Sequence, residues 1–140
     1  MAVIKGENTW ITVAEADLYL AYRLTASSWF ALPESASPGD KSKETLLVTA
    51  FFFLQSKYGI PASSTDDNLR IAQCELALFF CDFYEQYFQA GLLQAEGTGT
   101  LSASSASQSF RKDMDLPEFV LAPLNAFLAT SRNTLVDLEP

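Results

Sequence analysis

The side chains best suited to chemistry lie together on one segment, residues 66–93, which contains Cys74, Glu75, Asp82 and Glu85. The sequence contains no histidine, so it lacks the base that Ser-His-Asp and Cys-His nucleophilic sites require. Cys74 is therefore predicted to be a buried structural thiol. The three carboxylates could form a metal cluster, but no other segment supplies the Glu-x-x-His motif of a di-iron site, which favours a solvated helix face.

Three further patterns have both a chemical and a structural interpretation. The run Asp-Asp-Asn at 66–68 resembles the start of a calcium-binding loop, but the remaining ligands do not follow, so it is predicted to cap a helix. Gly-Thr-Gly at 97–99 does not follow a predicted strand, as a glycine-rich phosphate-binding loop does, so it is not interpreted as one. The aromatic residues of 51–53 and 79–88 could stack on bases, but helical spacing without basic neighbours favours core packing. We expect no catalytic residue, no metal ligand and no cofactor, hence a binding protein rather than an enzyme.

The segment 66–93 is predicted to be the central helix of a small all-α bundle with about four main helices. Its apolar residues recur at steps of three and four in two adjacent stripes, so its middle turns are apolar around most of the circumference. Such a helix must be wrapped by others, with Glu75, Asp82, Gln86 and Gln89 on the arc that faces water or a partner. The predicted core residues are Leu69, Leu76, Phe79, Phe80, Phe83, Tyr87, Phe51, Leu54, Leu18 and Trp29.

The length and composition indicate one domain that is acidic. The chain has 140 residues, of which 49% are hydrophobic, enough to bury a core. It carries 9 basic and 17 acidic residues, a net charge of −8, which makes nucleic acid a poor direct partner. No stretch is apolar for long enough to span a membrane, and the start lacks the apolar core of a signal peptide. Cys74 and Cys81 would lie roughly 10 Å apart along one helix, too far for a disulfide, so both are predicted to be reduced in a cytoplasmic environment.

Capping signals predict two helices before the central one. A capping box at 12–15 starts a helix that continues to Leu24. A short helix or turn follows and is stopped by Pro33. A second long helix begins with Asp40 or Ser42 as its cap and ends near 58–59. The residues of the first helix predicted to face inward are Ala14, Leu18, Ala21 and Tyr22.

The region after the central helix changes in composition. Residues 97–109 are almost entirely Ser, Thr, Gly and Ala, so they are predicted to form a flexible arm unless a partner orders them. The candidate partner-binding residues of this arm are Leu101, Phe110, Arg111, Lys112 and Met114.

The last predicted helix is led by Pro117, and Pro123 should kink it or mark its true start. The predicted divisions of the single domain 1–140 are an extended N-terminus at 1–11, a helical core at 12–94, the flexible arm at 95–115, a C-terminal helix at 116–132 and a tail at 133–140.

Four stretches resemble, in order, the pattern of a tailed-phage protein family. WITVAEADLYL at 10–20, followed by an Arg-Leu pair and a Ser-Trp pair, is similar to the family's helix start Y-V-T-x-x-E-A-D-x-Y. LLVTAFFFL at 46–54 resembles its A-L-x-x-A-x-x-x-L helix, and QCELAL at 73–78 resembles its Ala/Leu-rich long helix. LPEFVLAPL at 116–124 resembles its proline-led last helix. The chain departs from the family at 58–65, which is shorter than the usual insert.

Members of this family look like head–tail connector proteins (adaptor, head-completion) of phage necks, although they are often labelled DnaT-like single-stranded-DNA-binding proteins. The resemblance implies a helical subunit of a homo-oligomeric ring, dodecameric by analogy, between a portal protein and a tail-side neck or tail-terminator protein. It implies location in the virion, assembly in the bacterial cytoplasm, no membrane, and DNA that passes through without specific binding. The alternative is a DnaT-like single-stranded-DNA-binding accessory protein, which the label suggests and the negative charge opposes.

Overall fold

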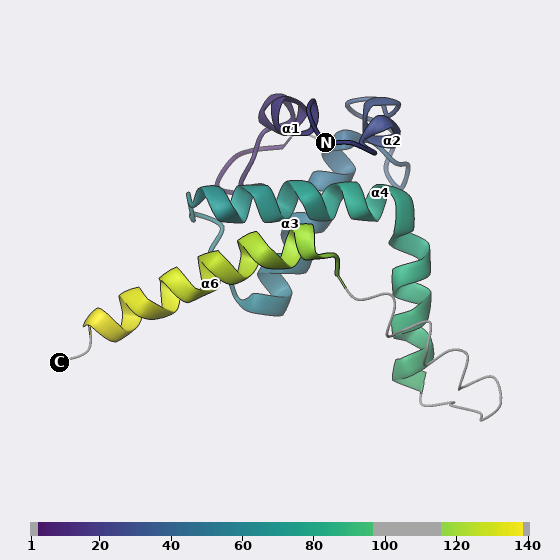
Figure 1. Cartoon of the computed structure of the whole chain (residues 1–140). Helices are drawn as coiled ribbons and strands as arrows, with labels where there is room; N and C mark the ends of the chain where they lie inside the picture. Colours follow the sequence, from purple (N-terminus) through teal and green to yellow (C-terminus); the bar gives the residue numbers. More distant parts are fainter. Residues whose placement is uncertain (1–2, 97–115, 139–140) are drawn as a thin grey trace.

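The computed structural model describes residues 3–96 and 116–138, and within these ranges it contains helices joined by loops and no strand. The helices are α1 (Val13–Leu20), α2 (Ser27–Phe30), α3 (Lys43–Tyr58), α4 (Asp67–Glu96) and α6 (Glu118–Leu138). The longest, α4, is central, because each of the other four packs against it (Figure 1). The predicted all-α bundle around one long helix is confirmed.

The capping box at the start of α1 forms as predicted. The amide of Glu15 donates to the hydroxyl of Thr12 at 3.1 Å, and the Glu15 carboxylate accepts from the Thr12 amide at 3.0 Å. This backbone hydrogen bond, together with the Lys5 ammonium at 2.9 Å, lowers the pKa of Glu15. The segment before it is not extended as predicted. It contains a turn at Gly6, whose φ of 87° lies in the region that glycine adopts without strain.

The predicted inward face of α1 is wrong. The helix ends at Leu20 rather than Leu24, and Leu18 is 74% exposed. The side chains it buries are Val13, Ala16 and Leu20. Apolar residues occupy two stripes of this short helix, and the sequence alone did not distinguish which one faces α4. The residues of the other stripe, all exposed, are Ala14, Leu18, Ala21 and Tyr22.

Helix α3 matches its prediction at both ends. The Ser42 hydroxyl accepts from the Thr45 amide at 3.1 Å, and Gly59 ends the helix in the left-handed conformation with φ 66°. Phe51 and Leu54 are fully buried. A buried amide, Gln73 on α4, donates to the Leu47 carbonyl at 2.8 Å and accepts from the amide of Trp10 at 2.9 Å, so it joins α3, α4 and the N-terminal segment.

Helix α4 differs between its two halves. From Ala72 to Leu78 every side chain is buried, which confirms that this half is wrapped on all sides. At Phe83 the backbone leaves helical geometry (φ −132°, ψ 15°), and the helix turns sharply away from the body (Figure 1). Phe83 is 45% exposed, so its prediction as a core residue is wrong, because the kink moves it off the buried stripe. Of the other predicted core residues, Leu69, Leu76, Phe80, Phe51, Leu54 and Trp29 are fully buried, and Phe79 and Tyr87 are partly buried.

Helix α6 is longer than predicted, since it extends to Leu138 rather than 132 and takes in most of the predicted tail. It begins at Glu118, ahead of Pro123, so Pro123 does not mark its start. Val120 and Leu124 are fully buried in the core that α6 shares with α4. The predicted flexible arm lies, apart from the helical residues 95–96, outside the described residues, and so do its candidate residues Leu101, Phe110, Arg111, Lys112 and Met114.

Candidate functional site

The residues whose side chains could take part in a reaction do not form a catalytic arrangement in the described parts of the chain. In the described ranges no group of three His, Cys, Asp or Glu side chains is placed to hold a metal ion. Cys74 is fully buried, as predicted, and its Sγ lies 3.9 Å from the carbonyl oxygen of Ala16. Burial, and secondarily the nearby carboxylates Glu75 and Asp17, raise the pKa of the Cys74 thiol, which keeps it protonated.

Glu75 is buried rather than placed on the predicted solvent-facing arc, and only 3% of the residue is exposed. Its carboxylate accepts from the Tyr19 hydroxyl at 2.6 Å and from Nε of Arg23 at 3.2 Å. A buried carboxylate requires such partners, because its charge would otherwise be left without solvation. Glu75 therefore anchors the end of α1 to α4, while Asp82 and Glu85 remain exposed, so the three do not form a cluster.

Arg23 links this pair to α6. Its guanidinium carbon lies 3.6 Å from the centre of the Phe119 ring, a close cation–π contact. Its Nη1 also donates to the carbonyl oxygen of Leu24 at 3.3 Å. The Arg23 side chain, from the turn that follows α1, thus contacts both α4 and α6. No local pattern in the sequence pairs positions 19, 23, 75 and 119, so the network was missed at the level of sequence.

The kink of α4 has a specific polar contact. The ammonium of Lys41, in the loop before α3, donates to the carbonyl oxygen of Cys81 at 2.9 Å. This carbonyl lies two residues before Phe83, near the end of the first half of α4, where the helix dipole favours a cation. Lys41 therefore stabilises the point at which α4 changes direction.

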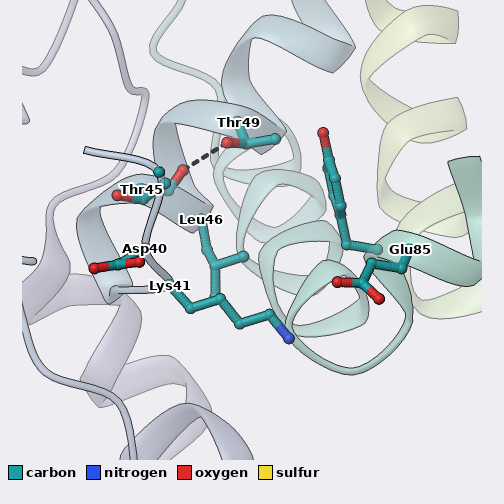
Figure 2. Close-up of a pocket in the computed structure, with 8 residues that line it drawn as sticks. Asp40, Lys41, Thr45, Leu46, Thr49 and Glu85 are labelled. Atoms are coloured by element: carbon teal, nitrogen blue, oxygen red, sulfur yellow. Dashed lines mark hydrogen bonds between the residues drawn. The ribbon is translucent and has the colours of Figure 1, made fainter. Parts of the chain in front are cut away.

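A groove of about 380 Å³ lies beside this kink. Its lining comes from the loop before α3, from α3 and from the second half of α4, and Figure 2 shows the labelled side chains around it. Leu46 is buried beneath it, and the hydroxyl of Thr49 is already satisfied by the Thr45 carbonyl at 2.7 Å. The lining residues are Gly39, Asp40, Lys41, Thr45, Leu46, Thr49, Tyr84 and Glu85.

The charges in the groove are unbalanced. Asp40 and Glu85 are exposed, and neither takes part in a salt bridge within the described parts of the chain. Lys41 is directed to the Cys81 carbonyl rather than to either carboxylate. With the Tyr84 ring on its α4 side, the groove combines an aromatic wall with two carboxylates, which suits a basic side chain next to an apolar one.

Among the exposed apolar residues in the described parts of the chain, two groups lie close together in sequence. The first, here the α1 surface, comprises Leu18, Tyr22 and Leu24, which are 74%, 95% and 82% exposed. The second, here the α4 surface, comprises Phe83 at the kink and Tyr84 and Phe88 beyond it, which are 45%, 39% and 40% exposed. Contiguous exposed apolar side chains are typical of interaction sites.

The basic side chains in the described parts of the chain are all engaged. Four of them lie on carboxylates, in the pairs Lys5–Glu15, Arg23–Glu75, Lys43–Asp17 and Arg70–Asp67. Lys41 contacts a carbonyl, and the Lys57 ammonium lies 5.4 Å from the centre of the Phe53 ring. Lys5, Lys41 and Lys57 are exposed but each has a partner within the described residues, whereas a phosphate-binding surface needs several cations free to contact the backbone.

No described helix is both long and apolar enough to cross a membrane. Comparisons with protein-family models, with curated proteins and with solved structures found no match.

Proposed function

We propose that the protein is a structural subunit of a tailed-phage particle, a head–tail connector whose copies form a ring between the portal and the tail. The observation that carries this proposal is the presence of two different apolar surfaces, the α1 surface and the α4 surface, on one small chain. When the patch on one copy binds a different patch on the next, the contact is heterologous. Such contacts close into a ring if the rotation between copies permits it.

The sequence pattern supports the same proposal. The stretch at 10–20 contains the capping box that begins α1, and the stretch at 116–124 contains the start of α6. The likeness to the connector family therefore includes residues that define helix ends. The proposed partners are a portal protein on one side of the ring and a tail-side neck or tail-terminator protein on the other, within the virion.

One observation favours the second candidate, a single-stranded-DNA-binding protein. The exposed rings of the α4 surface are of the kind on which bases stack. The charged residues in this half of the helix, Glu85 and Glu96, are however both acidic. Base stacking without cations along the backbone gives weak binding, so the connector is the better supported function.

The two functions are separated by measuring mass and DNA binding on the full chain. We expect light scattering to show concentration-dependent self-association, and we expect the chain to co-purify with a portal protein expressed beside it. We expect no binding of a labelled single-stranded oligonucleotide at about 0.15 M salt. If the chain is a monomer, does not co-purify with the portal protein and binds the oligonucleotide with strong salt dependence, the single-stranded-DNA-binding function is the better supported one.

A further inference from the structure

The groove beside the kink is open to solvent and carries a net negative charge. No cation among the described residues forms a salt bridge with its two carboxylates. Asp40 and Glu85 lie on it, and its one cation, Lys41, is bound to the Cys81 carbonyl. Copies of a chain with net charge −8 repel one another. An attractive contact between copies at this groove must therefore bring a local positive group.

The sequence restricts where that group can come from. Of the nine basic residues, the six in the described parts of the chain are engaged within it, as set out above. The others are Arg111, Lys112 and Arg132, and the first two form the one adjacent basic pair in the sequence. Phe110 directly precedes this pair. The order apolar, basic, basic matches a groove that has an aromatic wall beside a carboxylate.

We propose that the groove binds residues 110–112, Phe-Arg-Lys, of a second copy of this chain, with Phe110 against Tyr84 and Arg111 on Glu85. This inference deepens the proposed connector function and rests on it. It makes the interface heterologous, because a segment near the start of α6 enters a groove between α3 and α4 of the next copy.

The length of the connecting chain permits the contact. Residues 97–115, between Glu96 and Leu116, could span about 60 Å if fully extended. A compact domain of this length has a radius of gyration of about 14 Å. A segment of that length reaches beyond its own domain. Acidic Asp113 follows the basic pair directly, so a shift in register would place a carboxylate on the groove, and the contact is specific in register.

Charge reversal tests the contact on the full chain. Glu85→Lys and Arg111→Glu should each weaken self-association about tenfold or more, measured by sedimentation velocity. The double variant should recover association, because the charges are exchanged. An equimolar mixture of the two single variants should recover it too, because each contact between unlike copies again joins opposite charges. Glu34→Lys, an exposed change of the same charge outside the groove, is the control and should leave association unchanged.

The mixture decides between one copy and two. Recovery in the double variant without recovery in the mixture would place the contact inside a single chain and overturn the proposal. Self-association that is unaffected by both single variants would also overturn it, while leaving the connector function standing. Failure of the unmodified chain to associate at all would instead count against the connector function.

A photo-cross-linking experiment can detect the contact even if the rings are not stable enough to isolate. A photoreactive phenylalanine analogue at Thr49, in the groove, should cross-link to the peptide that contains 110–112 in a mixture of isotopically light and heavy protein. Mass spectrometry should find light–heavy products. Cross-links confined to one isotopic form, or formed with other peptides, would contradict the proposal. The same substitution at Ser56, an exposed position of α3 outside the groove, serves as the matched control and should not give this product.

Discussion

Tyr19 donates its hydroxyl hydrogen to the buried carboxylate of Glu75 at 2.6 Å, and this contact joins α1 to the central helix. The same carboxylate accepts from Arg23, whose guanidinium stacks on Phe119 of α6. One acidic residue therefore fixes the positions of two helices that reach α4 from different parts of the sequence. Among the buried residues that the structure describes, it is the only one with a charged side chain.

Glu75→Gln should destabilise the protein by about 1–3 kcal/mol, because it removes a charge-assisted hydrogen bond and leaves Arg23 without its carboxylate. Asp82→Asn, at an exposed site seven residues along the same helix, should change stability by less than about 0.5 kcal/mol. Urea unfolding of both variants measures the difference. Equal small effects would mean that the network does not hold the fold.

Stability should fall at alkaline pH, in part through Tyr19. Burial, and then its hydrogen bond to Glu75, raise the pKa of Tyr19 well above its usual range in the folded state. The unfolded chain loses this phenol proton near pH 10. Between these two values the folded state binds more protons than the unfolded state, so stability declines as pH rises and is fully present below pH ~10. Tyr19→Phe should make the midpoint temperature of unfolding less sensitive to pH above ~9.5. If the midpoint temperature falls with pH as steeply in the variant as in the unmodified protein, Tyr19 does not cause the alkaline loss of stability.

Lys41→Met should loosen the kink of α4 without unfolding the domain. The variant keeps the aliphatic stem but removes the ammonium from the Cys81 carbonyl. A cation at such a helix end contributes about 0.3–1 kcal/mol, so amide hydrogen exchange around Phe83 should accelerate about two- to fivefold. In Lys57→Met, which loses contact with a ring rather than a carbonyl, exchange there should stay unchanged.

Phe80→Ala should cost about 3–5 kcal/mol, since the ring is fully buried and packs on Phe53 with centroids 5.5 Å apart. Phe52→Ala, at a ring that is 49% exposed, should cost less than about 1 kcal/mol. Thermal unfolding measures both variants at matched concentration. Similar losses from the two substitutions would show that the aromatic residues of α3 and α4 are not divided into buried and exposed sets.

Local signals predicted the fold well where one residue decides a helix end. Ser42 and Gly59 bracket α3, and Thr12 with Glu15 starts α1, because capping depends on neighbours in sequence. The same reasoning failed where a contact between residues far apart in sequence determines whether a side chain is buried. Glu75 looks solvent-facing by helical phase, and its burial depends on Tyr19 and Arg23, which are more than fifty residues away.

The kink and the groove could not be predicted for a related reason. The kink lies at Phe83 rather than at a proline or glycine, so the sequence at this position carries no signal for a break in the helix. The groove arises because Lys41 and Asp40, from a loop, lie opposite Glu85 on α4. Patterns along one helix contain no information about which loop lies beside it.

The kink at Phe83 also makes the second half of α4 a lever. From Phe83 to Glu96 the helix extends about 20 Å, so a rotation of about 10° at this single residue displaces its far end by about 3 Å. The first half is buried on all sides, and rings cross the kink, since the Phe80 ring centre lies 6.3 Å from that of Tyr87 and 5.8 Å from that of Phe88, so such a rotation must repack these rings. The aromatic contacts across the kink therefore set how far the second half of α4 can turn relative to the first.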